Sequence, residues 1–251
     1  MSALDIFSMI VNVSNILREL EAGGMRLEIG DDFVEYRRLR QTQTDRSPIY
    51  PMFDVSCSYV DQSNAFWICG FNDSGELVHT QAMRFLDLSG VSLGQHMRQH
   101  RHKYITPNST PDPDRTYYSR PLALKTITGQ VCYHGEFWLS GGDAGYRKKG
   151  FTPLLSRIAF ELALKSWVPN YVFGFINAKL AFKGTQMHHG YSHCEPGVWH
   201  GPDDQITDED CLVWMNTREI VHFLQTQPKA LSKEREFPEQ RPSLQSIGVV
   251  A

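Results

Sequence analysis

The spacing of apolar residues in the first part of the chain predicts two helices with a short strand between them. Apolar side chains recur at helical intervals over 3–22, and the run ends at Gly23 and Gly24, residues typical of a helix C-cap. An alternating stretch over 25–30 predicts a strand. Asp31 and Asp32 can then cap a helix that runs through Phe33 toward Gln43. The N-terminal segment is therefore expected to be largely helical.

The rest of the chain alternates strand-like and helix-like runs up to about residue 224. Strands are indicated by β-branched and aromatic residues, helices by 3.6-residue periodicity and capping residues, and loops by Gly, Pro, Asn and Asp. The expected elements are a hairpin over 64–85 with its turn at 72–75, a helix within 89–104, a strand over 124–139, a helix over 152–167, a strand over 171–176, a helix over 178–183 capped by Asn177, a strand over 211–215 and a helix over 217–224. This order is typical of an α/β fold.

Composition narrows the class of protein. The 251 residues are 41% hydrophobic and 21% charged, which suits a folded globular domain, and the net charge of −3 gives no reason to expect a nucleic-acid partner. No apolar run is long enough for a membrane span, and the N-terminus lacks the basic start of a signal peptide. The five cysteines are odd in number and irregularly spaced, so we expect reduced thiols and a cytoplasmic protein.

The turn between the strand over 124–139 and the following helix has the composition of an anion site. It reads Gly145-Tyr-Arg-Lys-Lys-Gly150, and the predicted helix starts directly after it. Main-chain N–H groups at a helix N-terminus bind anions, and Arg147, Lys148 and Lys149 add positive charge around them. Gly150 permits close approach of the backbone. A pyrophosphate is the natural ligand for such a turn.

The same turn resembles the coenzyme A site of the GNAT acyltransferases. That superfamily has an Arg/Gln-x-x-Gly-x-Gly/Ala turn between its fourth strand and third helix, and this chain matches it at Arg147 and Gly150, with Thr152 in place of the usual small residue. In the family, the next strand splays from the fourth to admit the pantetheine arm, and a helix that starts with Asn follows. Here the strand over 171–176 and the helix capped by Asn177 occupy these places.

The resemblance implies a fold, a domain arrangement and a reaction. The fold is expected to be α/β and GNAT-like, with a central mixed, mostly antiparallel twisted sheet flanked by helices and an extra N-terminal helical segment. Residues 1–60 would be an N-terminal extension packed on the core, 61–227 the acyltransferase core and 228–251 a C-terminal tail. The reaction would move an acyl group, acetyl above all, from acyl-CoA to a small-molecule or peptide amine by direct attack in a ternary complex, without a metal. An oligomer is compatible with the sequence.

The resemblance also implies roles for individual residues. Glu136, flanked by aromatic residues in its strand, is the candidate base for the acceptor ammonium. The family's usual Tyr after the Asn is replaced by Phe182 and Lys183, so Tyr191 and His189 are the candidates for the acid. Main-chain N–H groups at Leu139 and Ser140 would polarise the thioester carbonyl. The expected cofactor-binding residues are Leu139, Ser140, Arg147, Lys148, Lys149, Gly150, Phe151, Thr152 and Asn177.

Two alternatives remain open. The order of Arg37, Arg38 and Arg40, then Asp54, then Glu136 loosely resembles acyl-homoserine-lactone synthases and N-acyl amino acid synthases, which take acyl chains from acyl carrier protein. The three arginines would then be a docking face for that acidic partner. The other alternative is a binding module that holds acyl-CoA without turnover. It follows from the absence of the family's Tyr after Asn177.

Overall fold

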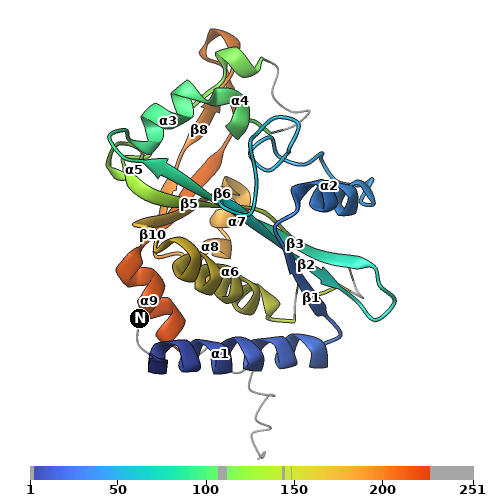
Figure 1. Cartoon of the computed structure of the whole chain (residues 1–251). Helices are drawn as coiled ribbons and strands as arrows, with labels where there is room; N and C mark the ends of the chain where they lie inside the picture. The colour runs from blue at the N-terminus through green and yellow to red at the C-terminus, as the bar shows by residue number, and fades with distance from the viewer. Residues whose placement is uncertain (1–2, 107–111, 143–144, 148, 227–251) are drawn as a thin grey trace, which may run out of the picture.

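The computed structural model describes residues 3–106, 112–142, 145–147 and 149–226. Helices and strands alternate along this part of the chain (Figure 1). In chain order the elements are α1 (Ala3–Ala22), β1 (Arg26–Gly30), α2 (Phe33–Gln41), β2 (Ala65–Phe71), β3 (Leu77–Leu88), α3 (Leu93–Gln99), α4 (Arg101–Tyr104), the 3₁₀ turn Pro113–Arg115, β4 (Tyr117–Ser119), α5 (Ala123–Thr126), β5 (Gly129–Leu139), α6 (Phe151–Trp167), β6 (Tyr171–Asn177), α7 (Ala178–Ala181), α8 (Thr185–His188), β7 (His193–Pro196), β8 (Val198–His200), the 3₁₀ turn Pro202–Asp204, β9 (Ile206–Asp208), β10 (Asp210–Asn216) and α9 (Thr217–Gln225).

A seven-stranded sheet forms the centre of the molecule, in the order β1-β2-β3-β5-β6-β10-β7. Neighbouring strands pair antiparallel, except for β5 and β6, which pair parallel. A parallel pair needs a crossover between its strands, and α6 supplies it. The expected fold class, a mixed and mostly antiparallel sheet flanked by helices, is confirmed.

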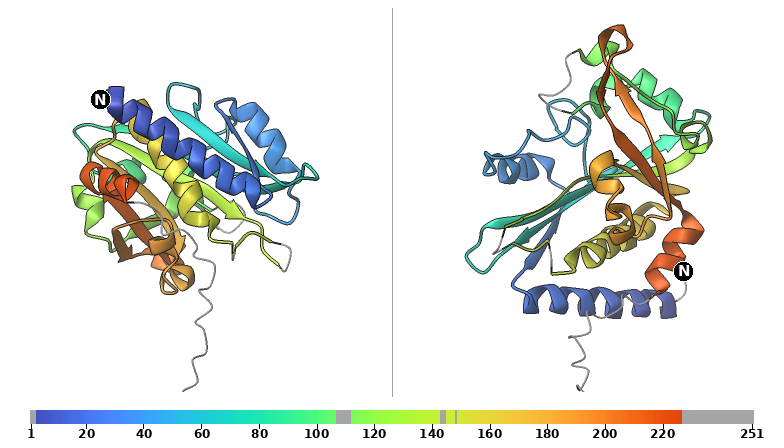
Figure 2. Two further views of the ribbon diagram at one scale, coloured as in Figure 1. Left: turned by 90° about the horizontal axis from the view of Figure 1, so that it is seen from below. Right: turned by 180° about the vertical axis from the view of Figure 1, so that it is seen from behind.

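Helices cover both faces of this sheet and bury a separate apolar core on each. On one face α1, α6 and α9 pack over β2, β3, β5 and β10, and Figure 2 shows α1 crossing α6. On the other face lie α2, α3 and α5, together with the segment over 49–60. The side chains of β5 alternate between the cores: Cys132 and Leu139 face α6, whereas Val131 and Tyr133 face α2. A residue on β5 therefore reaches one face or the other according to its position.

The N-terminal segment is part of this architecture. Gly23 and Gly24 end α1 as expected, and Asp32 caps α2 by accepting the main-chain N–H groups of Val34 and Glu35. However, β1 pairs with β2 along its whole length and is an edge strand of the central sheet. The division at residue 60 between an extension packed on the core and the core itself stays a prediction, with β1 as the strand that joins the two parts in one sheet. The expected tail over 228–251 lies outside the described residues.

Most of the expected elements are found close to their expected bounds, and the differences have local causes. The hairpin over 64–85 is confirmed as β2 and β3, and Asn177 caps α7 through its side chain. Residues 123–126 form the short helix α5, so β5 starts only at Gly129, whose positive φ of 81° marks a turn. The small sheet β4-β8-β9 was not expected, because strands of three residues are too short to show periodicity.

Within the described residues, no helix combines the length and the apolar character that crossing a membrane requires.

Candidate functional site

Strands β5 and β6 separate after a short stretch of pairing. Three residue pairs join them, from Val131 opposite Tyr171 to Tyr133 opposite Phe173. Beyond this point β5 stays paired with β3 as far as Leu139, and β6 stays paired with β10 as far as Asn177. Each strand therefore follows its outer neighbour, and β5 and β6 diverge. We call the region between the diverging strands the β5/β6 slot; its narrow end lies at His134 and Gly174.

A bulge in β5 borders the slot. Thr80 pairs with Trp138, whereas Ala82 pairs with Gly135, so β5 has one more residue than β3 over this stretch. Glu136 has a left-handed φ of 56°, a conformation that is strained for a residue other than glycine. The hydroxyl of Thr80 donates to the main-chain oxygen of Glu136 at 2.8 Å and helps to hold the bulge. Bulges of this kind redirect backbone groups and are frequent beside functional sites.

The side chain of Glu136 is fully buried and held by an ion pair. Its Oε2 accepts from Arg40 Nε at 2.7 Å and from the Tyr36 hydroxyl at 3.3 Å, and its Oε1 accepts from the main-chain N–H of Tyr50 at 2.8 Å. Both carboxylate oxygens are thus engaged by donors of the protein. In this arrangement Glu136 anchors α2 and the following segment to the bulge, and its expected role as base stays a prediction.

The same ion pair changes the interpretation of the three arginines on α2. Arg40 is buried, with only 3% of its side chain exposed, and it also donates to Gln43 and to the main-chain oxygen of Ser47. It is therefore not part of a docking face. Arg37 lies 3.7 Å from a carboxylate oxygen of Asp54, and Arg38 forms an exposed pair with Glu35. The basic surface expected for a carrier protein is reduced to two exposed side chains that already have partners.

The turn over 145–150, which we expect to bind the pyrophosphate, is anchored by two aromatic side chains. The hydroxyl of Tyr146 donates to the main-chain oxygen of Gly24 at 2.6 Å, and Phe151 packs against Gly23, where a Cβ would lie 2.2 Å from its ring. Gly150, with a φ of 71°, is the N-cap of α6 and provides no side-chain cap. The first main-chain N–H groups of α6 therefore receive no cap from the side chain of the N-cap residue.

Arg147 lies at the wide end of the slot. Its Nε donates to the main-chain oxygen of Leu139, the last residue of β5, at 2.8 Å, and its side chain packs beside Gly141. The rest of the side chain is exposed. Lys149 is also exposed; its Nζ donates to Gly23 and lies 4.2 Å from the Tyr146 ring centroid. Lys148 lies outside the described residues.

The backbone of β5 determines which groups face the slot. The N–H of Ser140 donates to the main-chain oxygen of Val78 on β3 at 2.9 Å, so it is not available to a ligand, contrary to our expectation. Main-chain groups alternate between the two edges of a strand, so those of Leu139 point the other way, toward Arg147 and the slot. Asn177, at the end of β6, is exposed and accepts from the main-chain N–H of Lys179.

A chain of buried hydrogen bonds ends at the narrow end of the slot. Nε2 of Gln81 donates to the main-chain oxygen of Leu155, so its Oε1 faces His134 Nε2 at 2.9 Å and must accept. His134 is neutral, because burial lowers its pKa well below the usual value. Its Nδ1 is therefore unprotonated and accepts the hydroxyl of Tyr191 at 3.0 Å. Burial raises the pKa of Tyr191, which keeps the hydroxyl protonated.

Gly174 is the residue that lets Tyr191 reach this point. A Cβ on Gly174 would lie 2.8 Å from the main-chain oxygen of His134 and 3.3 Å from the Tyr191 hydroxyl. The first contact is shorter than real Cβ atoms show, and it is with backbone, which cannot move aside easily. The absence of a side chain at this position thus places the Tyr191 hydroxyl at the point where the strands part.

Two further histidines lie beside this chain of hydrogen bonds. Phe137, which follows the bulge, stands between the rings of His189 and His79, at centroid distances of 4.3 and 5.0 Å. Nδ1 of His189 lies 3.0 Å from the Ser156 hydroxyl, and Nδ1 of His79 donates to the main-chain oxygen of Trp138. The structure thus brings the expected residues Tyr191 and His189 together on the α6 face. Glu136 lies on the opposite face.

Burial makes these histidines sensitive to acid. It lowers the pKa of His79 to about 3 and that of His189 to about 4, whereas an unfolded chain titrates near 6.5. Their contribution to stability is therefore complete above pH 6.5 and is lost as the pH falls toward 4, because the unfolded state then binds more protons. In this window, each of these two histidines should lower the free energy of unfolding by about 1.4 kcal/mol for every pH unit of acidification.

Urea unfolding of the wild type and of His189→Gln between pH 7.5 and 5 tests this expectation. The variant should lose about 1.4 kcal/mol less stability per pH unit than the wild type below pH 6.5. His102→Gln, at an exposed histidine, is the matched control and should keep the slope of the wild type. Equal slopes for all three proteins would show that His189 is not buried in its neutral form.

Sequence reasoning missed the partners that give the site its arrangement. The sequence indicates Arg40 only as part of a basic helix face, and neither His134 nor Gln81 lies in a recognisable motif. Period-two alternation places Gln81 on the same face of β3 as its neighbour Met83, but pairing it with His134 requires the register between β3 and β5. Long-range register is not encoded in any local pattern.

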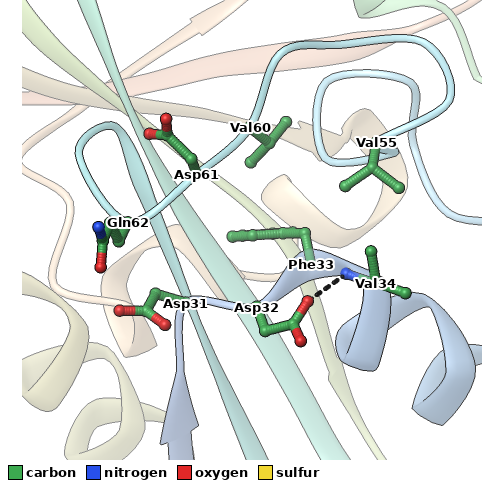
Figure 3. Close-up of a pocket in the computed structure, with 8 residues that line it drawn as sticks. All are labelled: Asp31, Asp32, Phe33, Val34, Val55, Val60, Asp61 and Gln62. Atoms are coloured by element: carbon green, nitrogen blue, oxygen red, sulfur yellow. Dashed lines mark hydrogen bonds between the residues drawn. The ribbon is translucent and has the colours of Figure 1, made fainter.

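A surface pocket beside the start of α2 is distinct from this site. Figure 3 shows it lined by Asp31, Asp32, Phe33, Val34, Val55, Val60, Asp61 and Gln62. Asp32 is the α2 cap, and Asp61 accepts the N–H and hydroxyl of Ser63, so both carboxylates serve their own loops. None of the residues expected for the acyl-CoA site lines this pocket.

Comparison with known proteins gives structural neighbours only. No protein-family model matches the chain, and no curated protein is significantly similar to it in sequence. Solved structures that superpose on it include spermidine/spermine N-acetyltransferase SpeG from Vibrio cholerae (TM-score 0.44, 6% identity, 80% of this chain and 96% of that chain). Two others are FeeM, an N-acyl amino acid synthase from uncultured soil microbes (0.41, 12%, 80% and 95%), and Arabidopsis thaliana NAA60 in complex with acetyl-CoA (0.43, 10%, 76% and 98%). At these TM-scores the functional argument rests on the geometry of the chain itself.

Proposed function

We propose that this protein is an N-acyltransferase of the GNAT type, which moves an acyl group from acyl-CoA to an amine. The observation that carries the proposal is the β5/β6 slot, with Arg147 at its wide end and the Tyr191 hydroxyl at its narrow end. A parallel pair that opens after three residues leaves main-chain groups of both strands without a partner strand. A pantetheine arm, which carries two amides, can pair with these groups.

The ends of the slot suit the two ends of the donor. At the wide end, the start of α6 and the exposed Arg147 offer positive charge to a pyrophosphate. At the narrow end, the thioester would lie beside the bulge, near the Tyr191 hydroxyl. Leu139, the residue expected to polarise its carbonyl, lies at the other end, next to Arg147. Seven residues around the slot are proposed to contact the donor: Leu139, Arg147, Lys149, Gly150, Phe151, Thr152 and Asn177.

The side chains at the narrow end suit proton transfer to a leaving thiolate. The amine nitrogen attacks the thioester carbonyl carbon, a C–N bond forms and the C–S bond breaks. Tyr191 gives its proton to the sulfur. The proton released by the nitrogen then restores the Tyr191 hydroxyl, so the protons of the step balance. Burial lowers the pKa of all three neighbouring histidines, to about 3 for His79 and about 4 for His189, so their rings are weak bases toward an ammonium group. The acceptor therefore reacts as the free amine, and kcat/KM should rise with pH toward the pKa of that amine.

The test is an acyl transfer assay with mass-spectrometric detection of the product. The purified protein is incubated with acetyl-CoA, octanoyl-CoA or palmitoyl-CoA and a panel of amines, and with the same acyl groups on acyl carrier protein. Transfer from at least one CoA ester supports the proposal. Transfer only from the carrier protein would point to the synthase alternative, and donor binding without any transfer would point to a binding module.

Arg147→Gln provides a prediction about the donor site. Because Arg147 is exposed, the substitution should leave the fold intact and remove one charge-assisted contact to the pyrophosphate. The Kd for acetyl-CoA should rise about tenfold at low salt, and the difference should shrink as ionic strength increases. Arg218→Gln, at an exposed arginine on α9, is the control and should bind as the wild type does. Equal Kd values for both variants would place the pyrophosphate elsewhere.

A further inference from the structure

Arg46 is a partly buried arginine held in a fixed position on the α2 face of β5. Its Nη1 donates to Gln43 Oε1 at 2.5 Å and to the hydroxyl of Thr80 at 3.1 Å. Its guanidinium carbon lies 4.6 Å from the ring centroid of Trp138. Both hydrogen bonds use Nη1, so the edge formed by Nε and Nη2 faces neither partner. An arginine stacked on an aromatic ring presents that edge as a preorganised fork for a planar anion.

The position of Arg46 connects it to the reacting end of the slot. The Thr80 hydroxyl that accepts from Arg46 itself donates to the main-chain oxygen of Glu136 in the bulge. Trp138, the residue that stacks on Arg46, follows the bulge by two positions. The guanidinium therefore lies beside the bulge on the face opposite α6, where an acceptor approaching the thioester from the far side of the sheet would arrive.

Two guanidinium groups lie beside the bulge. Arg40 and Arg46 lie close enough to repel each other, and Glu136 is paired with Arg40 at 2.7 Å. Among the residues that the structure describes, no carboxylate oxygen lies within 4 Å of a guanidinium nitrogen of Arg46. Burial and the charge of Arg40 lower the pKa of Arg46 to about 10, against the longer-range attraction of Glu136 and Asp45. An anion in direct contact with Arg46 would offset the loss of hydration that burial causes.

We propose that Arg46 binds a carboxylate of the acceptor, so that the substrate is an amino acid whose amine is directed at the thioester. The inference rests on the proposed function. Arginine forms paired hydrogen bonds with carboxylates in a fixed geometry, and in an α-amino acid the amine is two bonds from the carboxylate carbon. Holding the carboxylate at Arg46 therefore fixes the amine within a few ångströms of it, beside the bulge.

The test compares amino acids with their decarboxylated amines. Phenylalanine is paired with phenethylamine, tyrosine with tyramine and lysine with cadaverine, each with acetyl-CoA and octanoyl-CoA as donors. The wild type should prefer at least one amino acid, and Arg46→Gln should lower its kcat/KM ratio of amino acid to amine about 10- to 100-fold, mainly through KM. Arg46→Lys should restore part of the preference. Arg38→Gln, an exposed arginine on the neighbouring helix, should leave the ratio unchanged.

A second readout separates this inference from the proposed function. The preferred amino acid alone, without donor, should raise the melting temperature of the wild type and not that of Arg46→Gln. This result would support the carboxylate site even if no transfer were found. Conversely, transfer to decarboxylated amines as efficient as to amino acids, with a ratio that Arg46→Gln does not change, would overturn the inference while leaving the acyltransferase function intact.

Discussion

Tyr191→Phe is expected to lower kcat about 10²- to 10³-fold while leaving the Kd for acyl-CoA within about threefold of the wild-type value. The substitution removes only the hydroxyl, which lies at the narrow end of the slot and donates to His134. Donor binding should persist because the pyrophosphate contacts lie at the other end of the slot. A loss in kcat with unchanged donor affinity is the kinetic mark of a group that acts in the transition state.

A control is needed because the substitution also leaves Nδ1 of His134 without a donor. An unsatisfied buried acceptor costs about 1–3 kcal/mol of stability, so urea unfolding must show that the variant is folded under assay conditions. Tyr117→Phe removes a hydroxyl that pairs with Asp204 on the surface, and it should leave kcat unchanged. A kcat for Tyr191→Phe within threefold of the wild type would rule out Tyr191 as the acid.

Arg40→Met is expected to destabilise the protein by about 3–5 kcal/mol, because it leaves the carboxylate of Glu136 buried without its counter-ion. The double variant Arg40→Met/Glu136→Gln should be more stable than Arg40→Met, since no charge is then left unpaired. Urea unfolding of both single variants, the double variant and the wild type gives the coupling energy.

The matched control is Arg38→Met on the same helix. Its pair with Glu35 is solvent-exposed, so removing it should cost less than about 1 kcal/mol. If Arg40→Met were as mild as Arg38→Met, the buried ion pair would contribute nothing to the link between α2 and the bulge. If the costs of Arg40→Met and Glu136→Gln simply added in the double variant, the two side chains would not interact.

Local patterns in the sequence were sufficient to predict the elements that build the slot. The run over 171–176, the cap at Asn177 and the helix after Gly150 depend on period, capping and turn chemistry, all of which act within a few residues. The turn that contains Arg147 and Gly150 was also predicted, since a basic, glycine-containing turn before a helix is a local feature. These elements correspond to β6, α7 and α6.

The roles of side chains at the bulge could not be predicted in the same way. Aromatic neighbours of Glu136 along the chain suggested an unpaired, desolvated carboxylate, but Arg40 is 96 residues away in sequence and reaches it only through the packing of α2. The bulge itself depends on the register between β3 and β5. Likewise, Tyr191 and His134 are 57 residues apart, and Gly174 brings them together because it lacks a side chain.

The central claim is that the β5/β6 slot holds the pantetheine arm of an acyl-CoA with its pyrophosphate at Arg147. Calorimetric titration of the wild-type protein with acetyl-CoA and octanoyl-CoA measures this directly. One molecule should bind per chain, with a Kd between about 1 μM and 1 mM, the usual range of KM values for enzymes. Absence of binding by either thioester at millimolar concentration, with the protein folded, would contradict the claim.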